Sequence, residues 1–144
     1  MIKIYCGGTF DLAHFGHLNF FYNIKKLFPI SHITVALNTD YFIQSYKGKK
    51  PIFNYEERKE QLLLCPYIDE VVENTFNEDS KPTILAVKPN IIAVGSDWAD
   101  RDYCKQMQFD NMWLAENDFI LMFIPNKKIV SSTIIKNKIK HFKV

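Results

Sequence analysis

The 144-residue sequence predicts a doubly wound α/β domain built on a five-stranded parallel sheet. Three observations support this fold class. Short β-branched runs recur along the chain, stretches with helical patterning separate them, and no repeat, low-complexity segment or linker interrupts the series. Hydrophobic residues make up 47% of the chain and aromatic residues 15%, enough for a buried core. We therefore expect residues 1–144 to form a single domain.

Each expected strand is short and apolar and is bounded by turn or polar residues. The strands are expected at 2–6, 31–38, 67–72, 89–95 and 119–124. Helices are expected between them. The first is expected to start at or near His17 and to continue to about residue 28, and the others are expected at about 54–64, 82–88, 101–117 and 131–140. Residues 46–51 are expected to form a basic turn. The repeated order of strand, helix and strand predicts parallel pairs joined by right-handed crossovers.

Polar residues follow several of these strands. Gly8 and Thr9 follow the first strand, residues 38–40 follow the second, and Asp97 follows the fourth. Ligands of such sheets bind beyond the carboxyl ends of the strands. These residues therefore indicate the expected position of a binding site.

A run of ten residues between the first strand and the first helix carries two of the four histidines of the chain. It reads Gly8-Thr9-Phe10-Asp11-Leu12-Ala13-His14-Phe15-Gly16-His17. The two histidines are three residues apart, so they lie on one side of a first helical turn, where free backbone N–H groups favour phosphate. The alternative is one packed and one surface histidine. The adjoining strand, the double glycine and Asp11 favour phosphate binding.

This run resembles the motif of the HxGH nucleotidyltransferases, and the chain is most similar to their cytidylyltransferases, especially those specific for glycerol 3-phosphate. The similarity extends over nearly the whole chain and implies a Rossmann-like fold. It implies that His14 and His17 are catalytic. It also implies nucleotide contacts from Gly8, Thr9, Phe10, Asp11, His14, Gly16 and His17.

Basic residues farther along the chain have two possible interpretations. Lys47 and Lys49 flank Gly48 in a segment that is either a solvated loop or a loop that closes over phosphate. The resemblance assigns Lys47 to catalysis and acceptor binding, and Lys49 to the nucleotide. Arg58 matches a Tyr-x-x-Arg segment and is expected either to bind the acceptor or to form a structural ion pair. Lys81 is a further expected acceptor contact.

Two later segments also match the family, with departures. Asp97 and Trp98 resemble an element beside the nucleotide, although Ser96 replaces an Asp. Nucleotide contacts are also implied for the three hydroxyl residues that open the last helix, Ser131, Ser132 and Thr133. Asn126 and Ile129 replace an Arg and a Gly of the family pattern, and the segment 99–118 is longer than in the glycerol 3-phosphate enzymes. These departures affect the acceptor more than the reaction.

Composition excludes several other classes of protein. A net charge of +2 does not by itself indicate binding to nucleic acid. No apolar run approaches the ~20 residues that cross a bilayer. The three cysteines lack metal-ligand spacing and are expected to be reduced in a cytoplasmic protein. No protein-held metal site is expected, since His32 and His141 are isolated. Mg²⁺ is expected to arrive bound to a triphosphate.

The resemblance implies the transfer of CMP from CTP to a phosphorylated small alcohol such as glycerol 3-phosphate, giving CDP-glycerol and pyrophosphate. The resemblance also implies a homodimer. The alternatives within the superfamily are another acceptor, such as phosphoethanolamine or a polyol or sugar phosphate, or adenylyl transfer. Outside catalysis, the alternative is a nucleotide-binding regulator.

Overall fold

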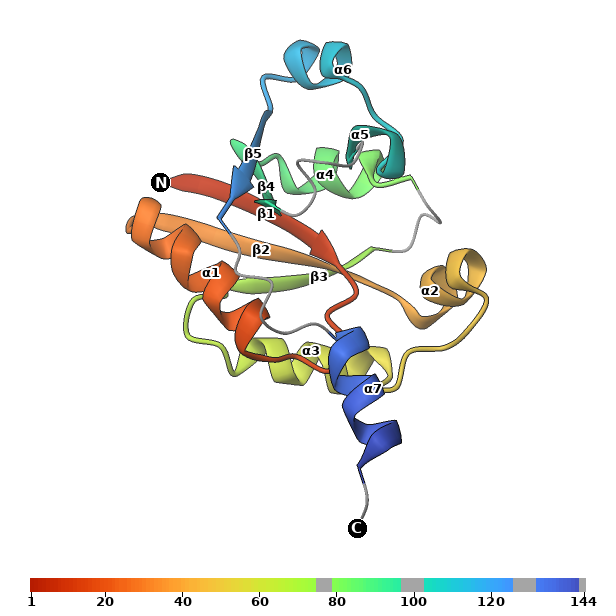
Figure 1. Cartoon of the computed structure of the whole chain (residues 1–144). Helices are drawn as coiled ribbons and strands as arrows, with labels where there is room; N and C mark the ends of the chain where they lie inside the picture. The colour runs from red at the N-terminus through yellow and green to blue at the C-terminus, as the bar shows by residue number, and fades with distance from the viewer. Residues whose placement is uncertain (75–78, 97–102, 126–131, 143–144) are drawn as a thin grey trace.

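The computed structural model describes residues 1–74, 79–96, 103–125 and 132–142. It is organised around one sheet of five parallel strands in the order β3-β2-β1-β4-β5 (Figure 1). The strands are β1 (Ile2–Gly8), β2 (Ser31–Asn38), β3 (Glu70–Asn74), β4 (Ile91–Gly95) and β5 (Ile120–Ile124). The five-stranded parallel sheet predicted from the sequence is confirmed.

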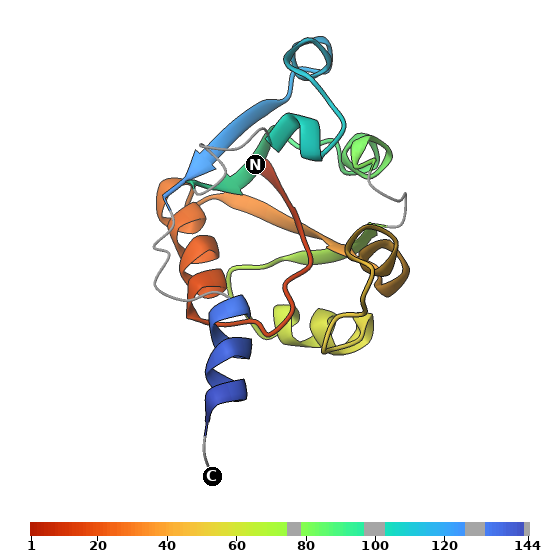
Figure 2. The ribbon, with the colours of Figure 1, turned by 45° about the vertical axis from the view of Figure 1, so that its right-hand side comes forward.

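Helices cover both faces of this sheet (Figures 1 and 2). On one face lie α1 (Phe15–Leu27) and α3 (Tyr55–Leu63), and on the other lie α4 (Lys81–Val87), α5 (Tyr103–Gln106) and α6 (Asn111–Glu116). Successive residues of β1 divide between the two cores because strand side chains alternate. Ile4 and Cys6 pack with α1 and α3, whereas Tyr5 packs with Ile84 of α4.

The strand order places a topological switch point beside β1. From β1 the chain moves outward through β2 and β3, and it then returns to build β4 and β5 on the other side. Ile4 of β1 is accordingly in register with Ile33 of β2 and with Ile91 of β4. In open α/β sheets the crevice beyond the carboxyl ends at such a point is the usual ligand site. Helices α2 (Asp40–Lys47) and α7 (Ser132–His141) lie at this edge (Figure 1).

Two helices begin at this edge. The first begins at Phe15 with His14 as its cap, close to the expected start at His17. Helix α2 was not predicted at all. Thr39 caps it by accepting a hydrogen bond from the Phe42 amide, and burial of Phe42 and Ile43 stabilises its single apolar face.

Two other elements differ from the prediction in their extent. The expected helix 101–117 is divided, in its described part, into α5 and α6. Gln108 adopts a left-handed backbone with φ 59°, and Asp110 opens α6 by accepting a hydrogen bond from the Trp113 amide. Strand β3 begins at Glu70 rather than at residue 67, because a turn in which the Ile68 amide donates to the Cys65 carbonyl precedes it.

Candidate active site

The turn that joins β1 to α1 is tightly folded. Phe10 and Leu12 both have left-handed backbones, with φ 50° and 53°. A Cβ on Gly8 would lie 2.8 Å from the Phe10 ring, so glycine is needed for this ring to approach the strand. The same ring meets the imidazole of His17 edge-on, with ring centres 5.2 Å apart. Gly8 therefore indirectly positions one of the two motif histidines.

His14 and His17 form a capping box at the start of α1. The Gly16 amide donates to His14 Nδ1 over 3.0 Å, and the His14 amide donates to His17 Nδ1 over 3.3 Å. A nitrogen that accepts a hydrogen bond carries no proton, so each neutral ring carries its proton on Nε2. The two rings stack with their centres 4.0 Å apart. The expected placement of both histidines on one helical turn is confirmed.

Burial keeps this pair uncharged. The pKa of His17 is lowered to about 4, first by burial and then by the neighbouring His14. Burial also lowers the pKa of His14. At neutral pH both rings are therefore neutral, and each has an Nε2–H group available to donate. Two parallel donors at a helix N-terminus can bind successive oxygens of a polyphosphate.

Asp11 holds this turn to two other segments. Its carboxylate accepts hydrogen bonds from the amides of Ile52 and Phe53, at 2.8 and 3.0 Å, and lies 3.5 Å from Lys136 Nζ of α7. Burial acts to raise the pKa of Asp11, but these two amides and Lys136 outweigh it and the pKa is lowered. The backbone carbonyl of Asp11 accepts from Ser132 Oγ. These contacts favour a positioning role for Asp11 over direct nucleotide contact.

The structure favours the ion-pair alternative for Arg58. Its side chain is fully buried and pairs with Asp40 over 2.7 Å. It also donates to the backbone carbonyls of Thr9, Asn38 and Phe53. The guanidinium therefore joins the ends of β1 and β2 to the start of α3. With these groups bound and no exposure, Arg58 does not fit its predicted role as an acceptor contact.

A chain of hydrogen bonds crosses the carboxyl ends of three strands. Thr83 donates to Asn74, Asn74 donates to Asn38, and Asn38 donates to Thr9, over 3.1, 2.8 and 3.1 Å. The Thr9 hydroxyl is also 3.4 Å from the Tyr46 hydroxyl. This network links α4, β3, β2 and β1 to α2, and sequence reasoning missed it. The available signals were the Asn residues that end β2 and β3.

The predicted lysines lie near this edge in different settings. Lys47 is the last residue of α2 rather than part of a loop, and its Nζ lies 5.5 Å from the centre of the Tyr46 ring. Gly48 ends the helix with φ 72°, and Lys49 follows it in an exposed position. Lys81 is partly buried at the start of α4.

Two predicted nucleotide contacts, Asp97 and Ser131, lie outside the described residues, as do the family departures Asn126 and Ile129. Ser132 and Thr133 open α7, with Ser132 bound to the turn that carries the histidines. The structure thus brings Thr9, Asp11 and Ser132 together around this turn, as expected.

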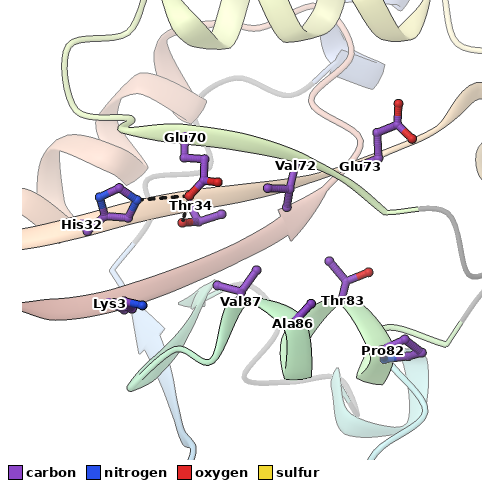
Figure 3. A pocket seen from close by; sticks show the side chains of 10 residues that line it. All are labelled: Lys3, His32, Thr34, Glu70, Val72, Glu73, Pro82, Thr83, Ala86 and Val87. Atoms are coloured by element: carbon purple, nitrogen blue, oxygen red, sulfur yellow. Dashed lines mark hydrogen bonds and ion pairs between the residues drawn. The ribbon is translucent and has the colours of Figure 1, made fainter.

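A separate cavity of about 450 Å³ lies between α4 and the sheet (Figure 3). In Figure 3, His32 and Thr34 of β2 both contact Glu70 of β3, at 3.2 and 3.3 Å, opposite Ala86 and Val87 of α4. None of the site residues predicted from the sequence lines this cavity. The candidate active site is therefore the edge that carries the histidine turn.

The described residues contain no cluster of three His, Cys, Asp or Glu side chains that could hold a metal ion. Among the helices of the described part of the chain, none is long and apolar enough to cross a membrane. A polyphosphate at this edge would thus meet neutral donors, backbone amides and lysines from the protein.

Comparison with known proteins identifies the family of this chain. Residues 5–138 match the family model described as cytidylyltransferase-like. The chain belongs to this cytidylyltransferase-like family. It is 31% identical over 139 residues to the glycerol-3-phosphate cytidylyltransferase of Bacillus subtilis, an alignment that covers 96% of this chain and 98% of that protein. The predicted kinship with the cytidylyltransferases is confirmed.

Other similar proteins show how far the resemblance extends. The FAD synthase of Pyrococcus abyssi is 35% identical over 96 residues, covering 67% of this chain and 64% of that protein. Among solved structures, the lipopolysaccharide core biosynthesis protein of Thermoplasma volcanium superposes with a TM-score of 0.68 at 24% identity, over 90% of this chain and 99% of that chain. That similarity supports the fold alone. The family relationship establishes a nucleotidyltransferase-type protein without fixing its substrates.

Proposed function

We propose that this protein transfers CMP from CTP to a phosphorylated small alcohol, with glycerol 3-phosphate as the best candidate. A phosphate oxygen of the acceptor forms a bond to the α-phosphorus of CTP. The bond from that phosphorus to the oxygen bridging the α- and β-phosphates breaks, and its electron pair leaves with pyrophosphate. The observation that carries the proposal is the stacked histidine pair, which directs two neutral donors from one helix N-terminus.

In this proposal, His14 and His17 bind the triphosphate and stabilise the charge that develops during transfer. Such reactions depend on positioning and hydrogen-bond donors, without a covalent nucleophile. The backbone of Gly8, Thr9, Phe10 and Gly16 shapes the phosphate site. A larger set of side chains completes the proposed nucleotide site: Lys49, Asp97, Ser131, Ser132 and Thr133.

Lys47 and Lys81 are the proposed acceptor contacts. Lys47 is exposed at the end of α2, so its ammonium is available to a phosphate group. We propose that Mg²⁺ enters with CTP, because the described residues offer no ligand cluster of their own and Mg²⁺ is commonly held by substrate phosphates. The metal would then neutralise charge on the triphosphate.

Glycerol 3-phosphate is the preferred acceptor because the Bacillus subtilis relative matches almost end to end. A second candidate function is adenylyl transfer, which the similarity to an FAD synthase favours.

We also propose a homodimer. The exposed Phe15, Leu18 and Tyr22 on α1 provide apolar surface for such an interface. The molar mass of the protein, measured by light scattering as it leaves a size-exclusion column, would test the dimer.

A substrate panel tests the reaction and its specificity together. Purified protein with Mg²⁺ would be given CTP, ATP, UTP or GTP against glycerol 3-phosphate, phosphoethanolamine and flavin mononucleotide, and pyrophosphate release would be followed. Release only with CTP and glycerol 3-phosphate is the expected result. Release with ATP and flavin mononucleotide would select the second candidate function. CTP binding without release from any pair would indicate a nucleotide-binding regulator.

A further inference from the structure

Asn38 and Asn74 meet at the carboxyl ends of two neighbouring strands. They are in register at the last positions of β2 and β3, and they are only 7% and 1% exposed. Asn74 Nδ2 donates to Asn38 Oδ1 over 2.8 Å. Asn74 Oδ1 in turn accepts from the hydroxyl of Thr83, which points from α4 toward the sheet (Figure 3). The side-chain oxygen of Asn38 is thus held by a buried donor, and its nitrogen faces the other way.

The nitrogen of Asn38 donates to the hydroxyl of Thr9, in the segment that leads to the histidines. The distance from Asn38 Nδ2 to Thr9 Oγ1 is 3.1 Å. The Arg58 guanidinium holds the two backbones together, since its Nη1 donates to the carbonyls of Thr9 and Asn38 over 2.9 and 2.8 Å. The two side chains therefore meet at fixed positions. The hydrogen bond between them runs in one direction, because an amide nitrogen donates and does not accept.

The direction of this bond decides what the Thr9 hydroxyl can offer a ligand. A hydroxyl has one hydrogen and two lone pairs. Because one lone pair of Thr9 Oγ1 faces the nitrogen of Asn38, the hydrogen must point away from Asn38. The Tyr46 hydroxyl of α2 is a second neighbour of Thr9 Oγ1, but at 3.4 Å it lies well beyond the roughly 2.7–2.8 Å of a good bond between hydroxyls. The hydrogen of the partly exposed Thr9 is therefore available to a stronger acceptor, such as a phosphate oxygen.

We propose that Asn38 is a positioning residue, which makes the Thr9 hydroxyl a donor directed at a phosphate of the bound nucleotide. Asn38 itself touches neither substrate. The contact between Asn38 and Thr9 is a property of the free protein, whereas its effect on the nucleotide rests on the proposed function. The buried bonds from Thr83 to Asn74 and from Asn74 to Asn38 keep the amide in the orientation that this role needs.

The first measurement follows the exchange of the Asn38 side-chain amide hydrogens in the free protein by ¹⁵N NMR. Thr9→Val keeps the shape of the side chain and removes the acceptor. These hydrogens should then exchange about fivefold faster, the factor expected for one neutral hydrogen bond. Thr9→Ser keeps the hydroxyl and should exchange like the wild type. Unchanged exchange in Thr9→Val would overturn the contact on which the proposal depends.

The second measurement is the Kd for CTP, by calorimetry, in a cycle of four proteins: the wild type, Asn38→Asp, Thr9→Val and the double variant. Asp keeps an oxygen for Asn74 but cannot donate to Thr9, so the Thr9 hydroxyl donates to the carboxylate and turns its hydrogen away from the nucleotide. The added negative charge weakens CTP binding in both backgrounds, and the cycle removes that common factor. Asn38→Asp should therefore raise the Kd about tenfold more with Thr9 present than with Val in its place.

Equal effects of Asn38→Asp in the two backgrounds would overturn the proposal, because a purely structural or electrostatic role of Asn38 does not require the Thr9 hydroxyl. If Asn38→Asp does not fold, Asn38→Ser takes its place in the cycle. Its side chain is too short to reach Thr9, and the same dependence on the Thr9 hydroxyl is expected.

Ser31→Ala is the matched control at the opposite end of β2. It removes a buried hydroxyl that donates to the Phe28 carbonyl, and it should leave the Kd for CTP at the wild-type value. A Kd raised as much as in Asn38→Asp would show that any loss from this strand weakens binding, and would overturn the specific role of Asn38. A wild-type protein that bound no CTP would overturn the proposed function and the link to the nucleotide, while the exchange experiment still decided the contact.

Discussion

The imidazole of His17 stacks on that of His14 with the ring centres 4.0 Å apart and the planes inclined by 24°. Each ring accepts a backbone N–H at Nδ1, and each therefore presents an Nε2–H on its other side. The same histidine pair thus caps α1 through its Nδ1 atoms and presents two Nε2–H donors. The capping and donor functions use different nitrogens, so substitution can separate them.

The first prediction uses this separation. An Asn at position 14 retains a side-chain acceptor near the place of Nδ1 and is a favoured cap, but it lacks the distal donor. His14→Asn should therefore unfold at nearly the wild-type temperature while turnover falls ~10²–10³-fold, the usual loss for one transition-state donor. Thermal unfolding and pyrophosphate release would be measured on the same preparation. Near-wild-type turnover would place the site elsewhere.

The second prediction concerns pH and His17. Its pKa is about 4 in the folded protein against an ordinary value of 6.5. Below pH 6.5 the unfolded chain binds a proton that the folded protein does not, so the free energy of unfolding should fall as pH drops from 6.5 to 4. The total change is about 3 kcal/mol at most, at 1.36 kcal/mol for each pKa unit.

This pH effect can be isolated with a variant. Urea unfolding of the wild type and of His17→Asn would be measured between pH 4 and pH 7.5. The difference in unfolding free energy between the two proteins should change between pH 4 and pH 6.5 and become constant above pH 6.5. Parallel curves would show that His17 titrates normally and that burial does not keep it neutral.

The third prediction concerns Arg58. Arg58→Met removes the donor to three backbone carbonyls and leaves Asp40 without its ion-pair partner. Asp40 is 41% exposed, so the main cost comes from the backbone carbonyls that lose their donor, about 1–3 kcal/mol for each that stays unsatisfied, and the variant should lose much of its stability. Lys59→Met, on the same helix, is the matched control and should unfold like the wild type. A stable Arg58→Met with a raised acceptor KM would restore the acceptor-binding interpretation.

The fourth prediction concerns Lys47. Because it is exposed and has no role in the core, Lys47→Ala should fold normally. Loss of one charge-assisted contact to the acceptor phosphate should raise the KM for glycerol 3-phosphate about tenfold. Lys50→Ala, three residues along in the same exposed segment, should leave that KM unchanged. Equal effects of the two substitutions would indicate general electrostatic attraction instead of a specific contact.

The sequence was sufficient to predict the sheet, because its strands are short apolar runs whose order permits few topologies. It was also sufficient to place the histidine pair at a helix start, because a fixed spacing and a double glycine act locally. Helix α2 was missed because its apolar face consists mainly of Phe42 and Ile43, too few to give a periodic signal.

Long-range polar contacts were beyond the reach of the sequence. Arg58 is 49 residues from Thr9, and Ser132 is 121 residues from Asp11. The sequence does not distinguish a buried arginine from an exposed one. Only the folded structure shows which carbonyls surround the Arg58 side chain. For the same reason, the sequence did not show that the Asp11 carboxylate accepts hydrogen bonds from two backbone amides, and its contact with the nucleotide stays a prediction.

The central claim, transfer of CMP from CTP to glycerol 3-phosphate, is tested most directly by identifying the product. The protein would be incubated with CTP, glycerol 3-phosphate and Mg²⁺, and ³¹P NMR would follow every phosphorus. The account predicts that the triphosphate signals are replaced by pyrophosphate and by a new diphosphate linking CMP to the acceptor, in equal amounts. A spectrum that stays unchanged, or that shows CMP and pyrophosphate without the joined product, would contradict it.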